Sequence, residues 1–188
     1  MDYIGACRPA LGVGGDYYDF LELPEGRFGI AIGDVSGKGI GASLMMASLQ
    51  ASLRGQAIHC GSDLAALMKH VNTLVYEAST SNRYATFFYA QLDLSTRRLI
   101  YVNAGHNPPF VLKKSGEVLK LEEGGAVVGM LPTMFVNYTQ GEVLLEELKD
   151  VYGQPSEEIM THIIACADRF ANGAKQHDDM TMIIVKII

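Results

Sequence analysis

Two aspartates follow glycines at positions where candidate strands begin or end. Asp16 lies in GGDYYD (14–19) and Asp34 in GDVSGKGIG (33–41), and a third acidic motif, HDDMT (177–181), stands before the last apolar stretch. Carboxylate and carbonyl oxygens are the ligands that Mg²⁺ and Mn²⁺ prefer in proteins. If the three segments converge at one rim of a sheet, they predict a divalent-cation site, and the glycines leave room for a bulky ligand.

Each motif also has an ordinary explanation. A Gly-Asp pair at a strand end is most often a turn in which the Asp side chain bonds the local backbone. In the same way, Asp178 and Asp179 could be an ordinary polar segment that precedes a strand. No single motif separates metal binding from a turn, so both interpretations stay open when the motifs are taken one at a time.

Other chemistries fit the glycine-rich stretch less well. A P-loop requires a glycine where Ile32 stands and a Ser or Thr after the lysine, but Lys38 is followed by Gly39. A dinucleotide fingerprint requires G-x-G-x-x-G, whereas Gly37, Gly39 and Gly41 give G-x-G-x-G. No serine sits in G-x-S-x-G and no cysteine has a neighbouring base, which argues against a protein nucleophile.

One histidine lies in a distinctive loop. His106, in AGHNPP (104–109), is a candidate metal ligand or base. The more ordinary explanation is a loop residue whose ring bonds the backbone. We favour the ordinary explanation, because no other potential ligand stands at ligand spacing from His106.

The composition predicts a globular, acidic domain. Of the 188 residues 48% are hydrophobic and 19% are charged, with a net charge of -6, which is typical of a chain with a buried core. An acidic chain without a Lys/Arg cluster is a poor candidate for nucleic-acid binding. Cys7, Cys60 and Cys166 are far apart, which predicts reduced thiols in the cytoplasm and no zinc site. We also expect no signal peptide and no membrane association, because no stretch reaches ~18 continuous apolar residues.

Strand patterns outnumber helical ones. We expect strands over residues 3–8, 27–33, 84–93, 98–103, 109–114, 117–121, 135–145 and 181–188, and helices over residues 43–57, 62–78 and 156–171. The 62–78 segment has a continuous apolar stripe, with Ser62 as its expected N-cap. This order of elements favours antiparallel sheets covered by helices over an alternating parallel sheet.

One junction lacks turn chemistry. Residues 140–145 have a strand pattern and residues 146–151 a helical pattern, yet no Gly, Pro, Asn or Asp separates them. A strand cannot reverse into a packed helix without such residues. Either one element covers both stretches, or residues are missing near 145–147.

Together the motifs resemble those of the PPM (PP2C-like) protein phosphatases, specifically the bacterial SpoIIE/RsbU branch. The matching segments are RP (8–9), VGGDYYDF (13–20), GDVSGKG (33–39), ATF (85–87), NAGHNPP (103–109) and DDMT (178–181), in family order. The resemblance implies a single PPM-type domain over residues 1–188, cut from a longer regulatory protein. The implied fold is α+β, a four-layer α-β-β-α sandwich of two antiparallel sheets flanked by helices.

The resemblance also implies a site for two ions, Mn²⁺ or Mg²⁺, at one edge of the paired sheets. Asp16 and Asp34 would bind them, with Asp34 bridging and the Val35 backbone carbonyl contributing. Asp178 would bind the second ion, and Asp179 is the less favoured acid of that pair. The ions would lower the pKa of a bridging water for in-line attack on phosphorus, so no protein nucleophile is needed.

The implied activity is hydrolysis of phosphoserine or phosphothreonine on a partner protein. In this branch the usual substrate is a STAS-type anti-sigma-factor antagonist, and an attached or separate sensor domain controls the phosphatase. One departure matters, because the family carries a further acid in a Thr-Asp-Gly segment after the 140–145 strand and this sequence has none. If that acid is deleted, the alternative is a catalytically impaired pseudophosphatase, a regulatory module that binds phosphoproteins without turnover.

Overall fold

The structure, a computed structural model, describes residues 1–79, 83–145 and 153–188. Its helices are α1 (Ile40–Ala57), α2 (Leu64–Ala78) and α3 (Ser156–Ala171). Its strands are β1 (Asp2–Arg8), β2 (Asp16–Leu23), β3 (Arg27–Val35), β4 (Ala85–Asp93), β5 (Arg98–Ala104), β6 (Phe110–Leu112), β7 (Val118–Lys120), β8 (Gly124–Gly125), β9 (Gly141–Leu144) and β10 (Met180–Lys186). No helix in this part of the chain is long and apolar enough to cross a lipid bilayer.

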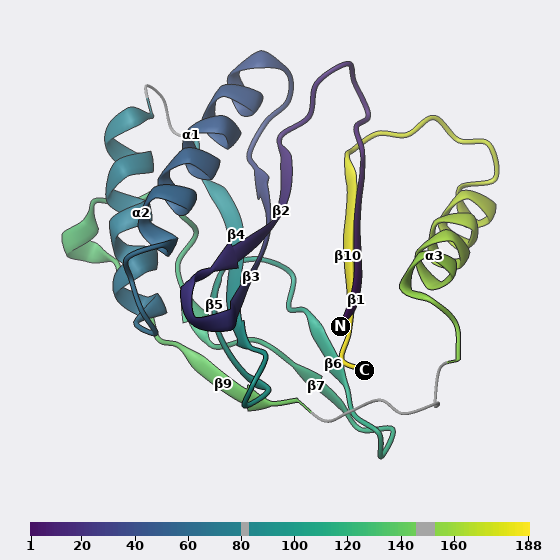
Figure 1. Cartoon of the computed structure of the whole chain (residues 1–188). Helices are drawn as coiled ribbons and strands as arrows, with labels where there is room; N and C mark the ends of the chain where they lie inside the picture. Colours follow the sequence, from purple (N-terminus) through teal and green to yellow (C-terminus); the bar gives the residue numbers. More distant parts are fainter. Residues whose placement is uncertain (80–82, 146–152) are drawn as a thin grey trace.

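The elements form four layers (Figure 1). A six-stranded sheet has the order β2-β3-β4-β5-β8, with β9 also paired to β5, and all of its strand pairs are antiparallel except β5–β8. α1 and α2 cover one face of this sheet, β1 and β10 lie over the other face, and α3 packs against β1 and β10 from outside. This α-β-β-α order confirms the fold expected from the sequence.

The second β layer is smaller than a full sheet. β1 pairs with β10, and β6 pairs with β7, as two separate two-stranded sheets. β6 begins at Phe110 and not at Pro109, because proline has no N–H to donate to a ladder. The predicted layer order is right, but this layer consists of two ribbons in the described part of the chain.

Two segments differ from their predicted structure. Residues 16–23 form strand β2, which was not predicted because acidic residues interrupt its apolar pattern. The strand predicted over residues 135–145 is wrong in its first half, since only β9 forms a ladder and Thr133–Phe135 form a 3₁₀ turn. The apolar pattern there reflects two buried side chains, Val136 and Tyr138, and not a continuous strand.

The start of α2 was misplaced by one residue. Asp63 is the N-cap of α2, and its carboxylate accepts a hydrogen bond of 2.9 Å from the N–H of Ala66. The predicted cap, Ser62, lies outside the helix. Asp and Ser cap helices about equally well, so the sequence alone does not separate two adjacent candidates.

Apolar side chains fill both faces of the six-stranded sheet. One cluster lies between this sheet and the α1–α2 layer, and it includes the fully buried Leu49 and Phe87. The cluster on the other face is rich in aromatic rings. There the ring of Tyr3 in β1 contacts those of Phe20 and Phe28, with centroids 4.7 Å and 4.8 Å apart. These contacts fix β1 and β10 against the ends of β2 and β3.

A charged network ties α1 to β2, close to Asp16 in the chain. The Arg54 guanidinium donates to both oxygens of the buried Asp19 carboxylate, at 2.7 Å and 2.6 Å, and the Tyr17 hydroxyl donates to Asp19 Oδ2 at 2.6 Å. Burial alone would raise the pKa of Asp19, but the hydrogen bonds from Arg54 and Tyr17 outweigh burial and hold that pKa below its ordinary value. The ionised carboxylate therefore anchors the helix layer to the strand that begins with Asp16.

Replacing Arg54 by Met is expected to destabilise the domain, because the variant leaves a buried carboxylate without its cation. The Arg54 side chain is 53% exposed, so we expect a loss of about 2–3 kcal/mol, less than for a fully buried pair. The melting temperature should fall by roughly 5–10 °C. Arg98→Met is a matched control, because Arg98 makes a bidentate pair with Glu142 on the exposed surface worth about 0–1 kcal/mol. Thermal denaturation compares the two variants, and equal losses would contradict the anchoring role of Asp19.

Candidate metal centre

The register of β2 against β3 puts Asp16 directly opposite Asp34. A tight turn joins the two strands, in which Glu25 and Gly26 adopt positive φ angles of 62° and 71°. Opposed residues of an antiparallel pair project from the same face of the sheet, with Cβ atoms about 4.5–5.5 Å apart. The two carboxylates predicted as metal ligands therefore meet at the open end of this hairpin.

The charges of these two carboxylates are not balanced by a protein cation. Among the described residues, no Lys, Arg or His forms an ion pair with Asp16 or Asp34. Burial, followed by the negative charge of Asp16, raises the pKa of Asp34 to about 6. Burial also raises the pKa of Asp16, although the Thr181 hydroxyl donates a hydrogen bond to Asp16 Oδ2. Asp16 is partly buried and Asp34 is exposed, and two carboxylates held together in this way fit a divalent cation, which would stabilise both.

The carbonyl of Val35 lies against the residue that precedes Asp16. A Cβ atom at Gly15 would stand 2.9 Å from the Val35 carbonyl oxygen, and the Val35 N–H donates to the Gly15 carbonyl at 3.3 Å. This close approach of two backbones requires a residue without a side chain at position 15. A backbone oxygen is thus held next to the strand that carries Asp16, and its role as a ligand stays a prediction.

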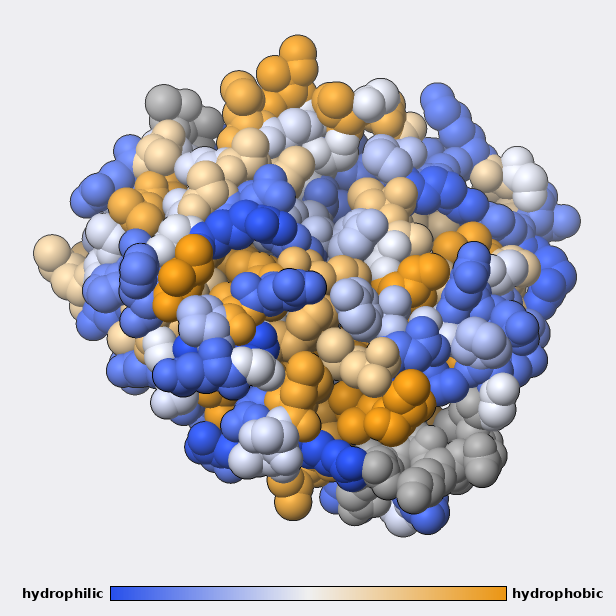
Figure 2. Space-filling view, viewed as in Figure 1, coloured by the Kyte–Doolittle hydropathy of each residue, from blue (hydrophilic) through white to orange (hydrophobic). Residues whose placement is uncertain are grey.

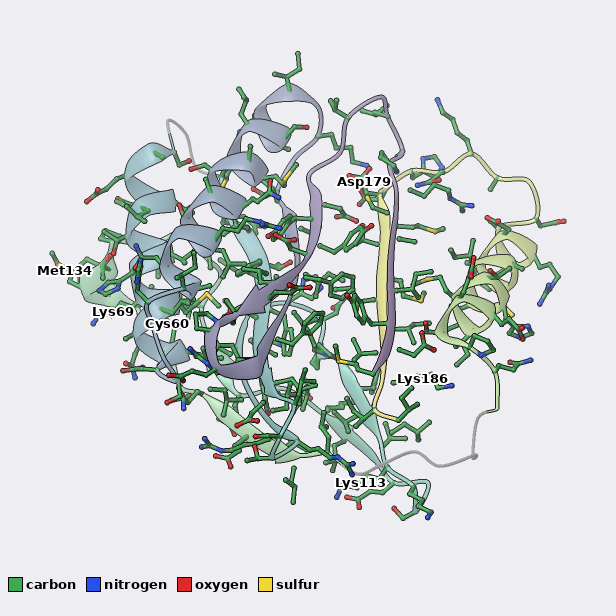
Figure 3. The ribbon with its side chains drawn as sticks, viewed as in Figure 1. Cys60, Lys69, Lys113, Met134, Asp179 and Lys186 are labelled. Carbon is green, nitrogen blue, oxygen red and sulfur yellow. The ribbon has the colours of Figure 1, made fainter. Side chains whose placement is uncertain are left out.

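The structure separates the two acids of the third motif. Asp178 is exposed and pairs with Lys38, whose Nζ lies 3.0 Å from Asp178 Oδ1. Asp179 instead accepts hydrogen bonds from the N–H groups of Ala10, at 2.8 Å, and Gly15, at 2.9 Å. Figure 3 shows Asp179 at the end of β10 nearest the loop between β1 and β2. Asp179 therefore holds this loop in place, and Asp178, the favoured ligand of the second ion, is bound to a lysine.

The described residues supply fewer converging ligands than the sequence led us to expect. Within residues 1–79, 83–145 and 153–188, no group of three or more His, Cys, Asp or Glu side chains is arranged to hold a metal ion. The junction near 145–147, where the sequence lacks the expected Thr-Asp-Gly acid, falls at residues 146–152, outside the described residues. The centre that the structure shows is therefore the pair Asp16 and Asp34.

A cavity of about 560 Å³ opens beside this pair. It is lined by Asp16, Asp34 and Asp179, together with Thr86 of β4 and His106 of the loop after β5. His106 Nδ1 lies 2.9 Å from Thr86 Oγ1, and burial lowers the pKa of its imidazole. His106 is a loop residue, as predicted, but the prediction that its ring bonds the backbone is wrong, because the ring bonds the Thr86 side chain. The missing signal was Thr86, which the register of β3 and β4 places opposite Asp34.

Exposed apolar side chains surround this end of the molecule. Leu11 and Val13 in the loop before β2, and Ile40 and Leu44 at the start of α1, are between 47% and 74% exposed. The Ser43 hydroxyl donates to the carbonyl of residue 14 at 2.8 Å and so joins the two segments. Figure 2 shows apolar groups gathered along the upper edge, where Figure 1 places the start of α1 and the β1–β2 loop. Exposed apolar patches of this kind often mark surfaces that contact other proteins.

The sequence is similar to those of known proteins. The family model of Stage II sporulation protein E (SpoIIE) matches residues 24–149. Phosphoserine phosphatase RsbU of Bacillus subtilis (strain 168) is 35% identical over 132 residues, which cover 68% of this chain and 38% of RsbU. The chain spans between 36% and 49% of the length of the first curated relatives it matches.

Solved structures share the fold at lower sequence identity. The SiaA-PP2C domain of Pseudomonas aeruginosa superposes with a TM-score of 0.80 at 18% identity, over 96% of this chain and 84% of that one. The structure of RsbX gives a TM-score of 0.73 at 17% identity, over 96% of this chain and 92% of that one. The fold is thus that of PP2C phosphatase domains. The SpoIIE family model matches well over half of this chain. The chain therefore belongs to the SpoIIE family of PP2C-like phosphatase domains.

Proposed function

We propose that this chain is the catalytic domain of a metal-dependent phosphatase that hydrolyses phosphoserine or phosphothreonine on a partner protein. The observation that carries the proposal is the pairing of Asp16 with Asp34 beside a cavity, in a chain of the SpoIIE family. The relative RsbU bears the name phosphoserine phosphatase, which supports the reaction. The RsbX structure was solved in complex with magnesium, which supports the kind of cofactor.

The described residues supply part of the ligand set that two divalent cations, Mn²⁺ or Mg²⁺, would need. Asp16 and Asp34 would hold them, with the Val35 carbonyl as a further oxygen ligand. The hydrogen bond from Thr181 orients the Asp16 carboxylate. When bound, such ions lower the pKa of a water molecule and neutralise phosphoryl oxygens. The protein contributes the spacing, which the β2–β3 register fixes, and the close backbone approach that Gly15 permits.

Asp178 is our proposed ligand for the second ion, and Asp179 is the less favoured one. The ion pair of Asp178 with Lys38 is exposed, and such pairs contribute little free energy. Replacement of Lys38 by a metal ion at the Asp178 carboxylate therefore costs little free energy. Asp179 would have to give up two charge-assisted hydrogen bonds from backbone N–H groups, which are stronger interactions.

A protein substrate fits this end of the molecule better than a small phosphate ester. The apolar rim formed by Leu11, Val13, Ile40 and Leu44 offers contacts to side chains around a phosphorylated residue. We propose a STAS-type anti-sigma-factor antagonist as the partner. The proposed location is the cytoplasm, which the three free cysteines support.

We propose that residues 1–188 form a single domain of a longer regulatory protein that includes a sensor. The chain spans only 38% of RsbU, which supports the longer protein. We also propose that residues are missing near 145–147. The family match ends at residue 149, close to the same junction.

A second candidate function is a binding module without turnover. It is favoured by the absence of a third converging ligand in the described residues and by the missing Thr-Asp-Gly acid. Such a pseudophosphatase would bind a phosphoprotein and regulate it by occupancy alone. Metal binding without hydrolysis distinguishes the module from the enzyme.

Asp34→Asn is expected to stabilise the metal-free domain at pH 7 and to abolish stabilisation by Mn²⁺. The folded-state pKa of about 6 lies above the ordinary value of 3.8, so the folded protein binds this proton more tightly. Stability without metal should therefore fall as the pH rises from about 4 through about 6, and Asn removes that fall. The measurement is the melting temperature between about pH 4 and pH 8 in EDTA, repeated near neutrality with Mn²⁺.

Asp63→Asn is the matched control for that experiment. Asn caps helices about as well as Asp, and Asp63 caps α2 and does not line the cavity. The control should keep both the pH dependence and the stabilisation by Mn²⁺. Retention of the Mn²⁺ effect in Asp34→Asn would contradict the role of Asp34 as a ligand.

Hydrolysis of p-nitrophenyl phosphate and of a phosphoserine peptide is expected to require Mn²⁺ or Mg²⁺. Asp16→Ala and Asp34→Ala should each lower kcat by roughly 100-fold or more, because several kcal/mol of charge stabilisation depend on the ions. Asp178→Ala should lower kcat more than Asp179→Ala, provided that both variants fold. Calorimetric titration with Mn²⁺ counts the bound ions. Full ion binding without turnover in the unaltered protein would establish the binding module and refute the enzyme.

Peptide mapping tests the proposed missing segment. Trypsin cleaves after Lys120 and Lys149, so the 188-residue sequence requires a peptide from Leu121 to Lys149. We expect this peptide to be absent from the natural protein and replaced by longer or additional peptides that carry the missing residues. Detection of the peptide with its calculated mass would show that the chain is continuous there.

A further inference from the structure

His106 lies in the cavity with the carboxylate pair and has no role in the function proposed so far. Its backbone is held firmly, since the His106 N–H donates to Asn103 Oδ1 at 2.8 Å. Asn103 is itself buried and donates from Nδ2 to the Leu121 carbonyl at 3.0 Å. Gly105, with a φ angle of 71°, supplies the turn that presents the histidine. The loop is therefore built to hold His106 in one place.

The imidazole ring has one bonded nitrogen and one free nitrogen. Nδ1 lies 2.9 Å from Thr86 Oγ1, and Thr86 is the residue that the sheet register places opposite Asp34. Nε2 has no hydrogen-bond partner among the described residues. If the Thr86 hydroxyl donates to Nδ1, the proton of the neutral ring resides on Nε2.

Several other donor side chains that line the cavity are partly or fully engaged. Arg8 uses two of its five N–H donors on the oxygens of Asp168, at 3.1 Å and 2.6 Å. The hydroxyl of Thr181 donates to Asp16, and that of Thr86 is bonded to His106. A phosphoryl group that enters this cavity needs donors for its oxygens. The unused nitrogen of His106 is a side-chain donor left for it, beside the remaining N–H groups of Arg8 and the side-chain amide of Asn107.

We propose that His106 is a substrate-binding residue, whose Nε2–H donates a hydrogen bond to a non-bridging oxygen of the phosphoryl group. Thr86 is its positioning residue, because the hydroxyl bonded to Nδ1 fixes the proton on Nε2. The inference rests on the proposed phosphatase function. A neutral donor suits the cavity, since a cationic ring would compete with metal ions for Asp16 and Asp34. The lowered pKa of His106 agrees with a neutral ring near pH 7.

The tautomer of His106 is the first test. Long-range ¹H–¹⁵N spectra of the domain with labelled histidine resolve its five histidines, and the His106→Gln spectrum identifies the signal of position 106. We expect a protonated Nε2 and an unprotonated Nδ1, and we expect inorganic phosphate with Mg²⁺ to shift the Nε2 signal. Thr86→Val should populate both tautomers. A protonated Nδ1 in the unaltered protein would overturn the inference.

Binding of inorganic phosphate is the second test, measured by calorimetry in saturating Mg²⁺. His106→Ala should weaken phosphate binding about 5–10-fold, the value of one hydrogen bond, and His106→Gln, which keeps an N–H donor, should recover most of it. His70→Ala, at an exposed position of α2, is the matched control and should bind phosphate normally. Mg²⁺ affinity should be the same in all variants, because His106 is not proposed as a ligand.

The outcomes separate this inference from the function on which it rests. Unaltered protein that binds neither Mg²⁺ nor phosphate would overturn both. If the unaltered protein binds both and His106→Ala binds phosphate equally well, the inference alone is wrong. If His106→Ala does not fold, His106→Phe, which keeps a planar ring without a donor, takes its place with the same expected loss.

Discussion

The β2–β3 hairpin holds two carboxylates on one face against their mutual repulsion. Asp16 and Asp34 are opposite each other in the ladder, so neither can turn away without a change of register that would also move the buried residues of both strands. The aromatic contacts and the Asp19–Arg54 network fix the register from the two sides of the sheet. The fold thus holds two like charges close together, which is electrostatically unfavourable. The neighbouring loops and strands are arranged around these two carboxylates.

Four separate parts of the chain lie next to Asp16 and Asp34, and each is held there by a different kind of contact. Gly15 lets the loop before β2 approach the Val35 carbonyl, and Gly14 lets the same loop approach the Asp179 carboxylate. β4 brings Thr86 next to Asp34 through the sheet, and the loop after β5 adds His106. β10 adds Thr181 and Asp179 across the gap between the two β layers. The site is therefore a property of the layered arrangement and not of any one motif.

The family resemblance correctly implied the layers, and the glycine-flanked acids pointed to Asp16 and Asp34, which the structure pairs and whose role as metal ligands stays a prediction. The sequence did not predict β2, since Asp16 and Asp19 interrupt the alternation by which a strand is identified. It also could not show that Asp179 bonds backbone N–H groups whereas Asp178 bonds Lys38. The partner of His106 was likewise hidden, because Thr86 meets it only through the pairing of distant strands. Residue types and spacing suggest a ligand set, but register and loop contacts decide which atoms meet.

The pairing of β1 with β10, which joins Asp2 to Lys186, has a consequence for the order of folding. The β2–β3 hairpin forms from neighbours in the chain, whereas β10 must close a far longer loop to reach β1. Contact order therefore favours formation of the carboxylate pair before β10 joins the domain. Thr181 and Asp179 arrive together with that strand. A domain in which β10 has not yet paired would hold Asp16 opposite Asp34 but would lack the Thr181 and Asp179 side chains that complete the lining of the cavity.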